Sequence, residues 1–323
     1  MKAKMGRRRF LQGTATAASG LVAGIGFEEQ ILLSHLGHNT AGQEVNPLAM
    51  PMPKGNIKGV EVSRVICGGN LIGGWAHSRD LMYVSRLFKA YNTDEKILET
   101  LRLCQEYGVN SILTNPVSGD IINRFWKEGG KIQWISEVHP RMDDHKTGVD
   151  SAVDNGASLA YIQGAVGDRL VADGQMELIA NTVQYIQEKG VPGGVGAHSL
   201  DVIIACEEAG VNPDFYVKTL HAEDYWSARR SDQTEEVIRN PHDNFWCVRP
   251  EKTIAYMKTV ERPWIAFKVL AAGAIHPRVG FRYAFENGAD FICVGMFDFQ
   301  VAEDTDVAIN ILAGLERERP WHA

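Results

Sequence analysis

The sequence has little of what marks nucleic-acid-binding or fibrous proteins. Its 33 Lys and Arg residues stand against 40 Asp and Glu residues, which gives a formal net charge of −7. This balance opposes binding to phosphate, and residues 7–9 form the only dense basic run. With 45% hydrophobic and 23% charged residues, the composition is typical of a globular chain. We therefore expect a globular protein that does not bind nucleic acid.

Cysteine is also scarce, with five residues in the chain. Cys67 and Cys293 fall in predicted strands, and Cys104 and Cys206 fall in predicted helices. We expect them to be small buried side chains, without a disulfide framework. Cys247 lies in a predicted loop.

The chain lacks an apolar run of the roughly 18 residues that a membrane span needs. Near the N-terminus, a weakly apolar stretch rich in Ala, Gly and Thr follows the order R-R-R-F-L at residues 7–11. This order resembles a twin-arginine export signal, although an N-terminal amphipathic helix is the alternative. The resemblance implies a leader over residues 1–42, contact with the twin-arginine export machinery, and a periplasmic or extracellular mature protein.

A repeating alternation of strands and helices begins near Val60, after a predicted linker over residues 43–58. Such alternation predicts parallel strands joined by right-handed crossovers. Eight units over about 255 residues favour an α/β fold, a closed (β/α)8 or TIM barrel over residues 59–323. The strands are predicted at 62–68, 111–115, 132–138, 159–163, 193–197, 215–220, 264–270 and 290–294.

The predicted third strand, I-Q-W-I-S-E-V-H-P from residue 132, has two polar side chains near its end. Glu137 and His139 are two residues apart, and side chains at this spacing project from the same face of a strand. TIM barrels carry their chemistry at the C-terminal ends of the strands. We therefore expect this carboxylate and this imidazole in an active site.

Imidazoles and carboxylates at the strand ends suggest a divalent transition metal, Zn, Mn, Fe or Co. The predicted ligands are Glu137, His139, His198 and His221. The alternative is that the same residues form hydrogen bonds in a substrate pocket without a metal. Further strand-end side chains predict substrate contacts from Asn70, Asn115 and Gln163.

Two lysines fall in predicted strands, where burial of an ammonium group is unfavourable unless it is paired or its pKa is lowered. Lys268 shares a predicted face with Trp264 and Ala266. We expect it to act as a general base, as a Schiff-base nucleophile or as the ion-pair partner of Glu137. Lys218 is a candidate for the same catalytic roles.

The stretches G-G-N-L-I-G-G-W at 68–75 and E-Y-G-V-N-S-I-L-T-N at 106–115 resemble the start of aldo-keto reductases. That resemblance implies a barrel and an NADP-linked oxidoreductase. The family places an Asp at the end of the second strand, then a Tyr, a Lys and a His. This chain has Asn115, Glu137 and Gln163 where the Asp, Lys and His are expected, so nicotinamide is the less expected cofactor. A G-x-G-x-x-G turn with an acid about twenty residues on, as in a Rossmann fold, is also absent after the first strand.

Two glycine-containing stretches, V-L-A-A-G-A-I at 269–275 and A-D-F-I-C-V-G-M at 289–296, resemble the phosphate-binding turns of many barrels. This resemblance implies that Gly273 and Gly295 present backbone N–H groups to an anion. The alternative is that these glycines only permit tight turns.

The sequence therefore predicts an exported, metal-dependent barrel enzyme. Its reaction would be a lyase, isomerase or hydrolase step on a small polar substrate, such as one derived from a carbohydrate. Two alternatives stay open. One is a divergent oxidoreductase similar to aldo-keto reductases, and the other is a solute-binding barrel without catalysis.

Overall fold

The structure is a computed structural model in which residues 50–75, 82–232 and 246–323 are described. The predicted leader over residues 1–42 lies outside these ranges, so export through the twin-arginine route stays a prediction. The start of the predicted linker over residues 43–58 also lies outside them, whereas its last part is described.

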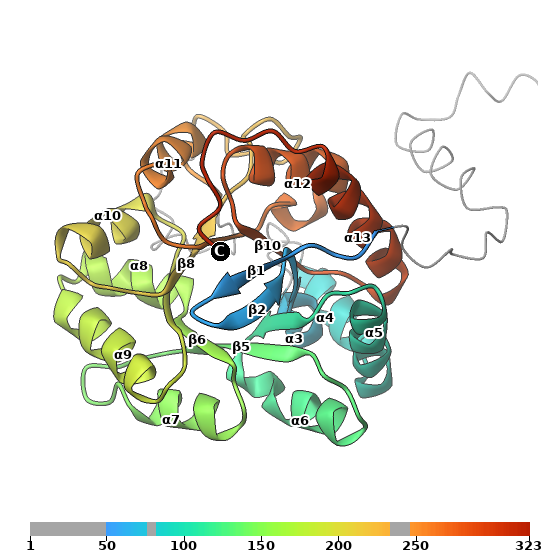
Figure 1. Cartoon of the computed structure of the whole chain (residues 1–323), viewed down its shortest axis with the longest axis horizontal. Helices are drawn as coiled ribbons and strands as arrows, with labels where there is room; N and C mark the ends of the chain where they lie inside the picture. The colour runs from blue at the N-terminus through green and yellow to red at the C-terminus, as the bar shows by residue number, and fades with distance from the viewer. Residues whose placement is uncertain (1–49, 76–81, 233–245) are drawn as a thin grey trace, which may run out of the picture. The chain divides into compact units, whose positions relative to one another are not determined.

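Within the described residues, eight parallel strands close into a barrel that is surrounded by helices (Figure 1). Around the barrel the strand order is β10, β3, β4, β5, β6, β7, β8, β9. Their bounds are β3 (Val65–Gly68), β4 (Ser111–Thr114), β5 (Gln133–Val138), β6 (Leu159–Ile162), β7 (Gly193–Ala197), β8 (Phe215–Thr219), β9 (Trp264–Phe267) and β10 (Phe291–Val294). The α/β barrel that the alternation predicted is confirmed.

The strands are joined through helices and short 3-10 turns. Their bounds are α3 (Asn70–Gly73), α4 (Met82–Tyr91), α5 (Asp94–Glu106), η2 (Pro116–Ser118), α6 (Gly119–Lys127), α7 (Thr147–Asp154), α8 (Gly164–Ala172), α9 (Met176–Glu188), α10 (Leu200–Glu208), α11 (Pro250–Met257), η4 (Ala271–Gly273), α12 (Pro277–Glu286) and α13 (Asp298–Ala313). Two caps follow from the sequence: Thr93 accepts a hydrogen bond from the backbone N–H of Lys96, and Ser199 accepts one from Asp201. Helix α8 was not predicted.

A β-hairpin lies across the barrel in Figure 1. Strands β1 (Lys54–Ile57) and β2 (Val60–Ser63) pair antiparallel, and Arg64 separates β2 from β3. Residues 54–57 thus form a strand inside the segment predicted as a linker, and the predicted strand 62–68 is broken in two. Because β2 leads into the start of β3, the hairpin covers the N-terminal end of the barrel.

The core fills the barrel interior beneath the C-terminal strand ends. Side chains at alternate strand positions, such as Ile135 and Leu159, join Ile57 and Val62 of the hairpin in one buried cluster. The N-terminal end is thereby closed by apolar packing. Access from solvent is left to the opposite end, where the βα loops lie.

The C-terminal tail is anchored beside the hairpin by a buried ion pair. Nη1 of Arg319 donates to Oδ2 of Asp290 at 2.7 Å, and both side chains are fully buried. The Arg319 guanidinium also donates to the backbone carbonyls of Met257 and Val260. Asp290 in turn accepts from the backbone N–H of Trp264, so one pair joins the tail, β9 and β10.

All five cysteines are buried thiols, as the sequence predicted for four of them. None of the helices in the described part of the chain combines the length and apolarity that crossing a membrane requires.

Candidate active site

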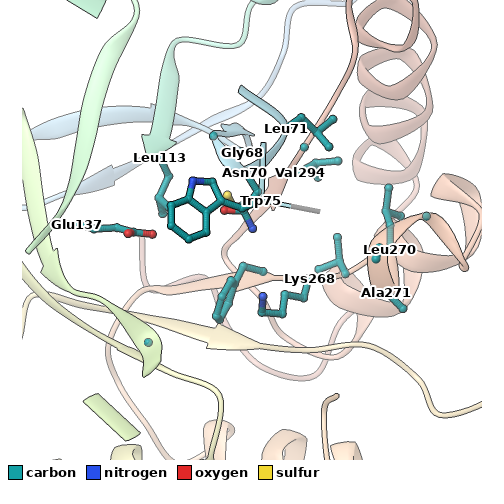
Figure 2. Close-up of a pocket in the computed structure, with 18 of the residues that line it drawn as sticks. Gly68, Asn70, Leu71, Trp75, Leu113, Glu137, Lys268, Leu270, Ala271 and Val294 are labelled. Carbon is teal, nitrogen blue, oxygen red and sulfur yellow. The ribbon is translucent and has the colours of Figure 1, made fainter. Parts of the chain in front are cut away.

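A cavity of about 260 Å³ opens at the C-terminal ends of the barrel strands, where the fold was expected to place its chemistry. Figure 2 shows Glu137 and Lys268 reaching this cavity from different elements, with Trp75 beside them. The polar and ionisable side chains that line it are Asn70, Glu137, Tyr161, Gln163, His198, Lys268, Cys293 and Gln300.

Glu137 lies near the end of β5 and shares its face with Ile135, whose side chain is in the core. Its carboxylate is fixed by two donors. Oε1 accepts from the Tyr161 hydroxyl at 3.1 Å, and Oε2 accepts from Nδ2 of Asn115 at 3.3 Å. The carboxylate is therefore held in one orientation at the cavity wall.

Tyr161 lies directly across from Glu137 in the β5–β6 register. Burial, and then the negative charge of Glu137, raise the pKa of Tyr161 well above its ordinary value. The phenol therefore stays protonated and donates to the carboxylate. Together the two groups form a hydrogen-bonded acid and base at one side of the cavity.

His198 follows β7 and is oriented by Asp168 of α8. Its Nδ1 lies 2.7 Å from Oδ2 of Asp168, and both side chains are almost fully buried. Asp168 also accepts from the backbone N–H groups of His198 and Ser199. An ionised carboxylate only accepts hydrogen bonds, so Nδ1 carries a proton and Nε2 is the nitrogen that would exchange a proton in catalysis.

Small residues make room for this pair. A Cβ on Gly164, the first residue of α8, would lie 3.0 Å from Cε1 of His198. A Cβ on Gly167 would lie 2.4 Å from the carbonyl oxygen of Gly196 in β7. Glycine at these positions lets α8 pack closely on β7, which brings Asp168 within hydrogen-bonding distance of His198.

Lys268 reaches the cavity by a route that the sequence did not predict. Ile265 belongs to the core cluster and Phe267 packs against it, so alternation should turn Lys268 toward the helices with Trp264. However, β9 ends at Phe267, and Lys268 has a left-handed backbone conformation with φ of 59°. This conformation turns the side chain into the cavity mouth, where Nζ lies 5.3 Å from the centroid of the Phe267 ring.

The loop after Lys268 is strained as well. Ala271 and Ala272 have φ values of 46° and 60°, which non-glycine residues rarely adopt. Each such residue destabilises the folded state by roughly 1–2 kcal/mol. Strain of this kind is concentrated at functional sites, and here it lies in a loop that lines the cavity.

Lys218 is not brought into the cavity, contrary to its prediction as a catalytic residue. It shares its strand face with Tyr216, whose hydroxyl contacts Glu207 of α10, and so it points toward the helices. Its Nζ donates to the backbone carbonyls of His198 and Thr219 at 2.8 and 3.0 Å. Burial lowers the pKa of Lys218, and the position suits the support of His198.

His221 is likewise held by the backbone and does not line the cavity. Its Nε2 accepts from the backbone N–H of Cys247 at 2.9 Å, and Nδ1 contacts the carbonyl of Ala222. These bonds fasten the end of the long loop after β8 to its start. His221 therefore supports that loop instead of joining the predicted metal site.

The predicted metal ligands do not form one cluster. His139 is exposed, and its Nε2 lies 3.4 Å from Oε2 of Glu137, whereas His221 lies apart from the cavity lining. Across the described ranges, no three His, Cys, Asp or Glu side chains are placed to hold a metal ion together. Metal dependence thus stays a prediction without an assembled ligand set.

Of the residues predicted to contact the substrate, most line the cavity and one acts through another residue. Asn70 and Gln163 line the cavity, as do Gly273 and Gly295, while Asn115 acts through Glu137. The N–H of Gly273 donates to the carbonyl of Leu270 at 2.9 Å, closing a turn. This corrects the expectation that it points at an anion.

Two residues of the site were missed. Tyr161 was not singled out, although the predicted strand 159–163 placed it on the same face as Gln163. Asp168 lies on the helix that was not predicted. The signal for it was an acidic residue between Val166 and Leu170, on the buried side of that helix.

Comparisons with known proteins support the fold. A scan of protein-family models finds no match, and a search of curated proteins finds no similar sequence. Two solved structures from Pseudomonas aeruginosa, both named as aldo-keto reductases, match with TM-scores of 0.56 and 0.57 at 15% identity. They cover 84% and 83% of this chain and 99% and 100% of their own. The chain therefore has a distant structural resemblance to aldo-keto reductase-like TIM barrels.

Proposed function

We propose that this chain is an enzyme that moves a proton between neighbouring atoms of a small oxygenated substrate, in an isomerase or lyase step. The observation that supports the proposal is a single cavity lined by a carboxylate, an aspartate-bound imidazole and an amine, Glu137, His198 and Lys268. These are the group types that general acid–base catalysis uses.

Each group has a role that fits its position. Glu137 removes a proton from a carbon next to a carbonyl, and the electron pair moves onto the carbonyl oxygen. The Lys268 ammonium stabilises the negative charge that develops on this oxygen. In an isomerisation, His198 protonates this oxygen and then takes the proton of the neighbouring hydroxyl group, while Glu137 returns its proton to the former carbonyl carbon, so that the carbonyl group moves by one atom. In an elimination, the electron pair returns from the oxygen and expels a hydroxyl group, which leaves as water with a proton from His198.

The proposal can be tested before the natural substrate is known. The protein is incubated in D₂O with a panel of small hydroxyketones, oxo acids and aldoses, and deuterium uptake at carbon is followed by NMR. We expect enzyme-dependent exchange with at least one class of compound. Lys268→Met should abolish the exchange, whereas Lys131→Met, at an exposed lysine outside the cavity lining, should leave it unchanged.

Other outcomes would favour the alternatives. About one equivalent of Zn, Mn, Fe or Co in the purified protein, together with exchange that a chelator abolishes, would favour the metal-dependent enzyme. A thermal shift induced by NADPH would favour an oxidoreductase. Tight binding of a compound that is neither exchanged nor converted would favour a solute-binding barrel.

A further inference from the structure

The cavity has a polar side and an apolar side. Glu137, Gln163 and His198 follow or end β5, β6 and β7, whereas Trp75, Phe88 and Phe297 line the cavity beside β3 and β10. In the eight-stranded ring β6 lies opposite β10, so the two groups face each other across the cavity. A ligand that fills the cavity therefore meets proton-transfer groups at one end and aromatic rings at the other.

The aromatic side is built as a contiguous set of rings. Phe297 contacts Phe88 and Tyr91 edge to face, with ring centroids 5.4 Å apart in each pair. Phe299 stacks on Phe297 at 5.3 Å with an interplanar angle of 9°. The exposed rings of Tyr91 and Phe299 thus continue the cavity wall to the surface, and we call these four rings together with Trp75 the aromatic rim.

The aromatic rim is held in place by groups behind it. Oδ1 of Asp298 accepts from the Tyr91 hydroxyl at 2.6 Å, and Oδ2 accepts from Nζ of Lys96 at 2.9 Å. Because Asp298 lies between Phe297 and Phe299, these bonds fix both rings against α4 and α5. A Cβ on Gly73 would lie 2.3 Å from Cδ1 of Trp75, so glycine there lets the indole lie on the backbone.

The size of the cavity limits what can bind. An apolar cavity of about 150 Å³ accommodates a benzene ring, so a cavity of about 260 Å³ leaves roughly 110 Å³, the room of three or four atoms at about 30 Å³ each. A six-membered ring on the aromatic side would therefore leave space for a short head group beside Glu137 and His198.

The apolar side favours an aromatic ring over a sugar ring. Next to the rim, most of the described lining consists of apolar side chains such as Leu71, Leu270 and Val294, and Asn70 at the start of α3 is a polar exception. Gln300 is polar, but its Oε1 accepts from the backbone N–H of Phe297 at 3.1 Å. Hydroxyl groups around a sugar ring would lose hydrogen bonds with water there, whereas an arene gains edge and face contacts.

We infer that the substrate carries an aromatic ring bound by the aromatic rim, attached to an oxygenated head group of three or four atoms. This inference rests on the proposed function for the reacting end. It adds a subsite that selects the substrate by its ring.

The test compares binding of matched probes by calorimetry. The first pair is 2-hydroxyacetophenone and hydroxyacetone, which share a head group and differ by the ring, and the second pair is benzyl alcohol and ethanol. We expect the ring-bearing member of at least one pair to bind at least about tenfold more tightly, the lower end of what burial of a phenyl ring contributes. Equal affinity within both pairs would overturn the inference.

Variants of the aromatic rim test whether these rings cause the preference for the ring-bearing probe. Trp75→Ala and Phe88→Leu should each reduce the preference for the ring, since both side chains line the cavity. Trp226→Ala is the matched control, because Trp226 is exposed and lies outside the cavity lining. A ring preference that survives both cavity variants would contradict the assignment to the rim.

The binding test is separate from the proposed chemistry. Glu137→Gln should lose deuterium exchange but keep the preference for the ring-bearing probe. Exchange without ring preference would overturn the aromatic subsite and leave the proposed function standing. Ring preference without exchange on any compound would overturn the proposed function and leave the subsite standing.

Discussion

Nδ1 of His198 lies 2.7 Å from Oδ2 of Asp168, and the two side chains are 3% and 0% exposed. The two residues are 30 positions apart, His198 directly after β7 and Asp168 in the middle of α8, so the contact depends on the close packing of these elements. It fixes which imidazole nitrogen carries the proton. The pair therefore gives His198 a defined role at the cavity.

Replacing Asp168 by asparagine tests this role. Asp168→Asn can donate to Nδ1 and so favours the other tautomer, with the proton on Nε2. We expect the exchange rate in D₂O to fall by roughly 10²–10⁴-fold, the range typical of lost acid–base catalysis. The control is Asp173→Asn, an exposed residue at the end of the same helix, and an equal loss there would contradict the role of Asp168.

Because Lys268 has a left-handed backbone conformation, two variants at this position distinguish its effect on catalysis from its effect on folding stability. We expect Lys268→Gly and Lys268→Ala both to lose exchange, because both remove the ammonium. Since glycine adopts φ of 59° without strain, the glycine variant should be more stable than the alanine variant by about 1 kcal/mol in chemical unfolding. An alanine variant of equal or greater stability would show that the strain is not present.

The buried carboxylate of Asp304 on α13 should make the stability of the folded protein depend on pH. Its Oδ2 is buried without a hydrogen-bond partner in the described structure, and burial raises the pKa of Asp304 to about 7. The pKa of Asp304 in the folded protein is above its ordinary value of 3.8. The contribution of this group to the free energy of unfolding is therefore fully present below about pH 4 and is lost as the pH rises to about 7. Asp304→Asn should remove this loss and stabilise the protein at pH 8 by roughly 1–4 kcal/mol.

The control for Asp304 is Asp306→Asn, an exposed position on the same helix. Chemical unfolding of the three proteins at pH 4, 6 and 8 makes the comparison. If Asp304→Asn and Asp306→Asn change stability equally at every pH, burial of Asp304 is not the cause.

The Arg319–Asp290 pair should matter for stability rather than for activity. Arg319→Met removes the guanidinium that is hydrogen-bonded to the buried Asp290 carboxylate and leaves Arg317, 3.7 Å from Oδ1, as its remaining cationic partner. Breaking a buried pair destabilises a protein by roughly 3–5 kcal/mol. The melting temperature should fall well below that of Arg278→Met, an exposed control on α12. A change of less than about 1 kcal/mol would show that the tail is held by other contacts.

The barrel could be predicted because its signals are local. Strand and helix periods repeat eight times, and caps such as Thr93 and Ser199 mark helix starts directly in the sequence. The hairpin was missed because its strands are only four residues each and are separated by a two-residue turn. So short a pattern is hard to distinguish from a linker.

The site could be predicted only in part, because side-chain direction depends on where a strand ends. Glu137 lies inside β5, and its face follows from alternation. Lys268 lies one residue past β9, and a single left-handed residue reversed its direction. Lys218 lies inside β8, and alternation alone would have turned it away from the cavity.

Long-range partners were also beyond the sequence. From the sequence, His221 resembles a metal ligand. In the structure its ring instead accepts a hydrogen bond from the backbone N–H of Cys247, 26 residues later in the chain. Asp168 becomes a site residue only through the packing of α8 on β7. Neither partner can be identified from spacing along the chain.

The most direct test of the account is the rate of deuterium exchange catalysed by wild-type protein and by Glu137→Gln, on the most reactive compound of the panel. Glutamine keeps the size of the side chain and can still accept a hydrogen bond from Tyr161 or Asn115, but it cannot remove a proton. The account predicts at least a hundredfold loss, within the roughly 10²–10⁴-fold range of general base catalysis, with an unchanged melting temperature. Exchange at the wild-type rate in a folded Glu137→Gln protein would contradict the central claim that this carboxylate is the base.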